Sequence, residues 1–131
     1  MEKSASRSKN IVLFGLEEAQ RTQLRDALSG QYEGVRSESF LPGLDRPLPL
    51  ETGRADLIFC AAEPSCYLRL LHALEQEEPN VPVIVVSSRP DVDAWLDAIE
   101  AGASDYCAPP FEPSHIRWMV EAALKPRNLA A

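Results

Sequence analysis

Several short segments of the chain are apolar at almost every position, and they constrain the fold more than any other feature. Three of them, residues 10–16, 55–62 and 81–88, read NIVLFGL, ADLIFCAA and VPVIVVSS. Continuous apolar runs of this length, rich in Val and Ile, are typical of strands that are buried on both faces of a sheet. A weaker strand is predicted over 33–40, and the stretch GASDYCAPPF at 102–111 supplies the last one.

Helices with one apolar face are predicted between these strands and after the last one. Gly30 ends the first helix, Pro64 opens the second, Gly102 ends the third and Pro113 opens the fourth. Their apolar faces, spaced three and four residues apart, are Leu24, Ala27 and Leu28; Tyr67, Leu70, Leu71 and Leu74; Val92, Trp95, Leu96 and Ile99; and Ile116, Met119, Val120, Ala123 and Leu124.

This alternation of buried strands and amphipathic helices predicts an α/β fold. A doubly wound parallel sheet, covered by helices on both faces in three layers, buries every strand. Ligands of such sheets bind beyond the carboxyl ends of the strands. The segments to inspect are therefore residues 15–18, 61–64, 87–90 and 108–111.

The length of 131 residues fits one domain. We expect a disordered tail over 1–9, the folded domain over 10–125, and a tail or the start of a linker over 126–131. Residues 41–53 carry three prolines and two glycines, so we expect a surface loop there rather than a helix.

The composition argues against several classes of function. The formal net charge is −7 and the basic residues are scattered, so a nucleic-acid surface is not expected. The chain has no apolar run long enough to span a bilayer and no apolar signal core, which predicts a cytoplasmic protein without a membrane partner.

The three cysteines do not form a recognisable metal motif. No pair has Cys-x-x-Cys spacing, and both histidines are distant in sequence. Cys60 and Cys107 fall within predicted strands and are expected to be buried free thiols. Cys66 is expected to be more exposed, although no sequence feature supports a redox role for it.

The order of these segments resembles the receiver domain of bacterial response regulators over residues 10–125. PVIVVSS is similar to the family pattern P-V-I-x-L-T-A, and AIEAGASDYCAPPFEPSHI to A-x-x-x-G-A-x-D-Y-L-x-K-P-F-x-x-x-x-L. RADLIFCA resembles P-D-L-I-L-L-D, and NIVLFGLEE resembles the opening I-L-x-V-D-D-E. The resemblance implies a flavodoxin-like (CheY-like) five-stranded sheet of order 2-1-3-4-5 and a role in two-component phosphorelay signalling.

The resemblance also implies a degenerate site. Receivers hold Mg²⁺ with paired acids after the first strand and accept a phosphoryl group on an aspartate that ends the third. A Thr or Ser and a Lys that end the fourth and fifth strands bind the phosphoryl oxygens. Here the acid positions carry Gly15 and Leu16, the acceptor position Ala61 and the lysine position Pro109, and only Ser87 matches. We therefore predict a pseudo-receiver that is not an enzyme.

Two weaker features remain near this site. Glu17 and Glu63 are the candidates for a displaced cation site, although acids at a helix start are ordinarily explained by the helix dipole. No cofactor and no metal are expected. By resemblance, the bond before Pro110 is predicted to be cis.

If the chemistry is lost, the function lies in the surface. In receivers the last two helices and the fifth strand contact partners, which corresponds here to residues 91–124. Tyr106 falls on the switch-aromatic position and Trp118 is a candidate interface anchor. Trp95 belongs to the same face, although its helical spacing predicts that its ring packs into the core. The expected partner is another protein, an output domain or a second copy.

Two alternatives stay open at this stage. Open parallel sheets also bind flavins and nucleotides, although GLEEAQ at residues 15–20 lacks a glycine-rich phosphate loop. The vacated pocket could also hold a small molecule or serve an enzyme.

Overall fold

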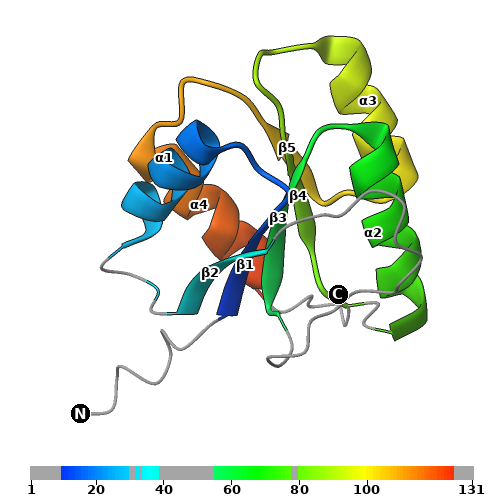
Figure 1. Ribbon diagram of the computed structural model, residues 1–131, viewed down its shortest axis with the longest axis horizontal. Coiled ribbons are helices and arrows are strands. Elements are labelled where there is room, and N and C mark those ends of the chain that lie inside the picture. The colour runs from blue at the N-terminus through cyan, green and yellow to red at the C-terminus, as the bar shows by residue number, and fades with distance from the viewer. Residues whose placement is uncertain (1–9, 30–31, 33, 39–54, 78–79, 126–131) are drawn as a thin grey trace.

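Five parallel strands form a single sheet in the computed structural model, which describes residues 10–29, 32, 34–38, 55–77 and 80–125. The strand order is β2-β1-β3-β4-β5 (Figure 1). The strands are β1 (Asn10–Phe14), β2 (Gly34–Glu38), β3 (Leu57–Ala61), β4 (Val83–Val86) and β5 (Asp105–Cys107). In the central pairings, Val12 lies beside Ile58, and Phe59 lies beside Ile84.

Two helices cover each face of the sheet (Figure 1). On one face lie α1 (Glu18–Leu28) and α4 (Pro113–Leu124), and on the other lie α2 (Pro64–Glu77) and α3 (Val92–Ala101). The predicted α/β fold with a parallel sheet between two helical layers is confirmed. No helix of the described part of the chain is long and apolar enough to cross a bilayer.

Some sequence predictions concern other parts of the chain. The predicted tails over 1–9 and 126–131 and the predicted loop over 41–53 lie outside the described residues, as does Gly30. The first helix is followed by Ser29, whose backbone N–H donates to the carbonyl oxygen of Arg25.

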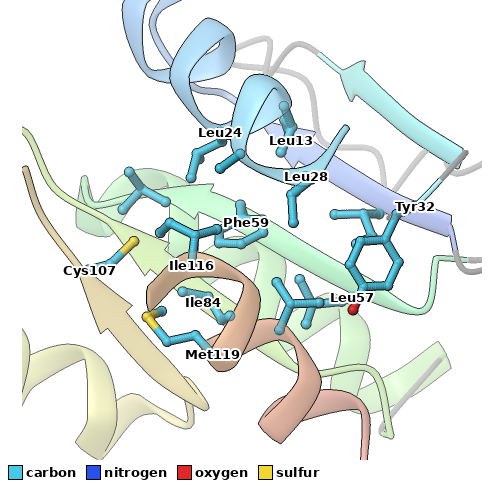
Figure 2. Packing of buried hydrophobic residues seen from close by; sticks show 14 of the residues in the cluster. Leu13, Leu24, Leu28, Tyr32, Leu57, Phe59, Ile84, Cys107, Ile116 and Met119 are labelled. Atoms are coloured by element: carbon cyan, nitrogen blue, oxygen red, sulfur yellow. The ribbon is translucent and has the colours of Figure 1, made fainter. Parts of the chain in front are cut away.

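The larger core cluster lies between the sheet and the pair α1 and α4. Figure 2 shows strand side chains such as Leu13 and Phe59 packed against Leu24 and Leu28 of α1 and Ile116 and Met119 of α4. The apolar faces predicted for these two helices are confirmed at Leu24, Ala27, Leu28, Ile116, Met119 and Val120, which are all buried.

The second core cluster lies on the opposite face, below α2. Its strand members include Val12, Ile58 and Val85, and the residues from α2 include Tyr67, Leu70 and Leu74, which are all buried. Both faces of β1, β3 and β4 are thus covered, which explains why their sequences are apolar at every position rather than at alternate ones.

The apolar stripe predicted to bury α3 instead faces solvent, which corrects the sequence-based assignment. Trp95 is 43% exposed, so the prediction that its ring packs into the core was wrong. The residues that α3 turns toward the sheet are small: Ala98 is fully buried and Ala101 packs against the α2-side cluster. The exposed residues of the stripe are Val92, Trp95, Leu96 and Ile99.

The ends of α3 are defined by specific backbone contacts. The side chain of Asp91 accepts a hydrogen bond from the backbone N–H of Ala94, 3.1 Å away, as expected for an N-cap residue. Gly102 follows the helix with φ of 116°, a conformation that side-chain-bearing residues rarely adopt. The helix and its connection to β5 are therefore fixed although its large apolar residues are exposed.

Candidate functional site

A cleft of about 390 Å³ lies at the carboxyl ends of β1, β3 and β4. This is the edge of the sheet at which ligands of open α/β folds bind. Its lining residues are Gly15, Glu17, Gln20, Ala61, Ala62, Glu63, Cys66, Val86, Ser87 and Ser88.

The chain turns sharply as it leaves β1. Gly15 has φ of 71°, in the left-handed region that glycine adopts without steric cost. The next side chain, that of Leu16, is only 4% exposed and packs in the core beneath α1 and α4. Position 15 therefore offers no side chain to the cleft, and position 16 is directed into the core.

Glu17 stands at the start of α1 and lines the cleft with an exposed side chain. Its backbone N–H donates to Oε1 of Gln20 at 3.1 Å, in the capping-box arrangement that stabilises a helix start. Gln20 is buried and contributes a polar group to the cleft wall. A carboxylate in the first turn is also favoured by the helix dipole, so the position of Glu17 has a structural explanation.

At the end of β3, Ala61 lines the cleft with a methyl group and Glu63 stands exposed beside it. Cys66, in the first turn of α2, is only 4% exposed, so the prediction that it is more exposed than the other cysteines was wrong. It is buried because the first turn of α2 packs against β3, which brings Sγ of Cys66 to 3.5 Å from Sγ of Cys60.

The hydroxyl of Ser87, at the end of β4, is engaged by its own loop. Ser87 Oγ donates to the carbonyl oxygen of Arg89 at 2.7 Å and accepts from the Arg89 backbone N–H at 3.2 Å. The side chain is buried. Ser87 therefore closes a local turn, and its hydroxyl would have to leave these partners to bind a ligand.

The loop after β5 contains the two adjacent prolines. The bond between Pro109 and Pro110 is cis, the conformation that the resemblance to receiver domains implied. Pro109 is half-buried and is absent from the lining of the cleft. Nearby, Cys107 is buried in the core beneath α1 and α4, and burial raises the pKa of its thiol to about 12.

Tyr106 of β5 is half-buried and packs against the α2-side core cluster. Its hydroxyl oxygen is buried and has no hydrogen-bond partner among the described residues. A buried polar group without a partner carries a desolvation cost, so the inward position of the ring is maintained by packing rather than by its hydroxyl.

The cleft unites five of the residues selected from the sequence, namely Gly15, Glu17, Ala61, Glu63 and Ser87. It does not include Leu16 or Pro109. Sequence reasoning missed Gln20 and Cys66, although the spacing of Gln20 three residues after Glu17 is that of a capping box. Within the described residues, no group of three or more His, Cys, Asp or Glu side chains is arranged to hold a metal ion.

Comparisons with known proteins agree with this architecture. No protein-family model matches the chain. The transcriptional regulator NtrC of Salmonella typhimurium is 35% identical over 69 residues, which cover 47% of this chain and 15% of that protein. The response regulator protein PilR of Pseudomonas aeruginosa is 31% identical over 61 residues, covering 47% and 14%. The chain thus spans a small part of the length of these relatives.

Solved structures match far more of the chain. The receiver domain of NtrX from Brucella abortus superposes with a TM-score of 0.72 at 25% identity, over 88% of this chain and 98% of that domain. The chain has the fold of a response-regulator receiver domain. A response regulator from Thermotoga maritima shares the fold, with a TM-score of 0.71 at 22% identity over 89% of this chain.

Large apolar side chains are exposed on α3 and on α4. Among the described strands, β5 pairs only with β4 and forms one edge of the sheet, and α3 and α4 precede and follow it in the chain. Trp118 of α4 is 63% exposed and stacks on His115, with ring centroids 6.2 Å apart. Trp95, on α3, adds a second exposed indole.

Proposed function

We propose that this receiver domain acts in signalling without being phosphorylated. The observation that carries the proposal is Ala61, which occupies the end of β3, where receivers have the acceptor aspartate. A methyl group has no oxygen to accept a phosphoryl group.

The neighbouring positions support the same proposal. Phosphoryl transfer depends on cations and positive charge that neutralise the phosphoryl oxygens. Gly15 has no side chain, Leu16 is packed in the core, and Pro109 carries no charge. Glu17 and Glu63 are the remaining acids of the cleft, and Glu17 already has a structural role at the start of α1.

We propose that the domain acts instead through protein–protein contacts on α3, β5 and α4. Exposed apolar groups that cluster on a surface mark interaction sites, and tryptophans are frequent anchors of protein interfaces. The exposed stripe on α3 and Trp118 on α4 fit this role. The partner would be an output domain, another protein or a second copy. An output domain fits the finding that the regulators similar to this chain are several times longer than it.

The proposal that the domain is not phosphorylated is tested by incubating the chain with acetyl phosphate and Mg²⁺ and measuring its intact mass. We expect no mass increase, while a receiver with an acceptor aspartate, treated in parallel, gains one phosphoryl group. Ala61→Asp alone is also expected to stay unmodified, because the cation-binding acids and the lysine would still be missing. An acid-labile adduct on the wild-type chain would overturn the proposal.

The contact surface is tested separately with the exposed stripe of α3. Sedimentation equilibrium of the wild type is compared with Leu96→Glu and with the matched control Leu68→Glu, an exposed position on α2. A self-associating chain should lose its association in Leu96→Glu and keep it in Leu68→Glu. Equal association of both variants would exclude the α3 surface as the interface between copies.

A further inference from the structure

Two thiols meet at the junction of β3 and α2. Cys60, in the central strand β3, is fully buried, and Cys66 lies in the first turn of α2. Their Sγ atoms are 3.5 Å apart. The short connection between the two elements produces this contact, because the Cys66 backbone N–H donates to the Glu63 carbonyl oxygen at 2.8 Å and folds the first helical turn back over the strand.

The two thiols differ in their access to solvent. Cys66 lines the cleft at the strand ends, whereas Cys60 does not. Cys107, the third cysteine of the chain, belongs to the core on the opposite face of the sheet. A small reagent that enters the cleft therefore reaches the sulfur of Cys66 first, and the sulfur of Cys60 lies directly behind it.

The contact also shifts the pKa values of the two thiols in opposite directions. The hydrogen bond with Cys60 lowers the pKa of the Cys66 thiol, against the opposing effects of burial and of the nearby Glu63 carboxylate. The same contact, together with burial, raises the pKa of Cys60. Thiolate, the nucleophilic form of cysteine, is thus favoured on the sulfur that faces the cleft.

We propose that Cys60 and Cys66 are a redox-active thiol pair that hydroperoxides convert to a reversible disulfide. The Cys66 thiolate attacks one peroxide oxygen, the O–O bond breaks, and the leaving oxygen takes up a proton, which leaves a sulfenic acid on Cys66. The sulfur of Cys60 then displaces the hydroxyl group as water and gives up its own proton. With hydrogen peroxide, two thiols and one peroxide yield one disulfide and two waters.

Disulfide formation would alter the cleft. The sulfur–sulfur distance must shorten from 3.5 Å to about 2.05 Å. β3 is paired with a strand on each side, so the first turn of α2 is the element free to shift. That turn follows Glu63 and carries Cys66, which both line the cleft. Oxidation would therefore reshape the vacated receiver site, independently of whether the domain is phosphorylated.

The pair is tested by differential thiol labelling of the full chain. After hydrogen peroxide treatment, free thiols are blocked with iodoacetamide in denaturant, disulfides are reduced with dithiothreitol, and the released thiols are labelled with N-ethylmaleimide. Trypsin releases both cysteines in one peptide, residues 55–69. We expect N-ethylmaleimide on both cysteines of this peptide and iodoacetamide on Cys107. Iodoacetamide on all three, or N-ethylmaleimide on Cys107 to the same extent, would overturn the proposal.

Three variants assign the roles. Cys60→Ser should accumulate a sulfenic acid on Cys66 that dimedone traps, Cys66→Ser should lose peroxide consumption, and the matched control Cys107→Ser should behave as the wild type. A dimedone adduct on Cys60 in the Cys66→Ser variant would contradict the assignment. Circular dichroism establishes that each variant is folded, and the wild-type labelling pattern decides the question for any variant that is not.

Discussion

The backbone N–H of Asn10 donates a 2.8 Å hydrogen bond to Oδ2 of Asp56. In return, the Asp56 backbone N–H donates to the carbonyl oxygen of Asn10 at 2.7 Å. This reciprocal pair ties the first residue of β1 to the residue before β3. It therefore places the Asp56 carboxylate at the amino ends of the strands, at the opposite edge of the sheet from the cleft.

Removing the Asp56 carboxylate should destabilise the fold. We expect Asp56→Ala to lower the free energy of unfolding by about 1–2 kcal/mol, because a part-buried backbone donor loses a charged acceptor. Asp56→Asn, which keeps an acceptor oxygen, should lose less. Urea unfolding monitored by circular dichroism measures both, and an alanine variant as stable as the wild type would show that the bond contributes nothing.

The orientation of α3 predicts that its small residues matter more for stability than its large ones, the opposite of what its sequence pattern predicts. Ala98→Leu should lower the free energy of unfolding by about 1–3 kcal/mol, because Ala98 is fully buried against the sheet and the larger side chain must displace packed neighbours. Leu96→Ala, on the exposed stripe, should change it by no more than about 0.5 kcal/mol. Urea unfolding compares the two, and the reverse order of effects would mean that the stripe is buried.

α3 also shows where sequence reasoning failed in the fold. The strands and the faces of α1, α2 and α4 were predictable, because large apolar residues recur there with one clear periodicity. In α3 two stripes compete, the large residues at 92, 95, 96 and 99 and the small residues Ala98 and Ala101. The larger residues dominate a hydrophobic pattern, although in α3 it is the small residues that face the sheet.

For the candidate site, the sequence predicted several residues of the cleft but not the contact between the two thiols. The rule that ligands bind at strand carboxyl ends selected Gly15, Glu17, Ala61, Glu63 and Ser87, which do line one cleft. The burial of Cys66 and its contact with Cys60 depend on how tightly the first turn of α2 folds back onto β3, which no local pattern encodes.

Tyr106 should tolerate loss of its hydroxyl. Because the buried hydroxyl has no partner among the described residues, Tyr106→Phe should leave the free energy of unfolding unchanged or raise it by up to about 1 kcal/mol. Tyr106→Ala should lower it instead, because the ring leaves the α2-side core cluster. Thermal and urea unfolding of both variants test this, and a phenylalanine variant clearly weaker than the wild type would reveal a partner for the hydroxyl.

Burial of Cys107 predicts a loss of stability at alkaline pH. Its pKa rises from an ordinary 9.0 to about 12 in the folded state, so above pH 9.0 the unfolded chain loses this proton while the folded chain retains it. The stabilisation that the protonated thiol gives to the fold is complete below pH 9.0 and is lost as the pH rises toward 12. In this range the free energy of unfolding falls by up to about 1.4 kcal/mol per pH unit.

Urea unfolding at a series of pH values from neutral to alkaline measures this slope. The variant Cys107→Ala lacks the thiol and should lose stability less steeply with pH, even if its stability at neutral pH is lower because of the smaller side chain. Parallel curves for the variant and the wild type would mean that Cys107 does not titrate differently in the two states.

The inward position of Leu16 limits which substitutions this position can accept. Since its side chain fills part of the core beneath α1 and α4, a mutation to aspartate would bury a carboxylate among aliphatic groups before it could bind any cation. Such a mutation would thus be selected against until neighbouring residues had changed as well. This dependence on packing would prevent a cation-binding acid from arising at position 16 by a single substitution.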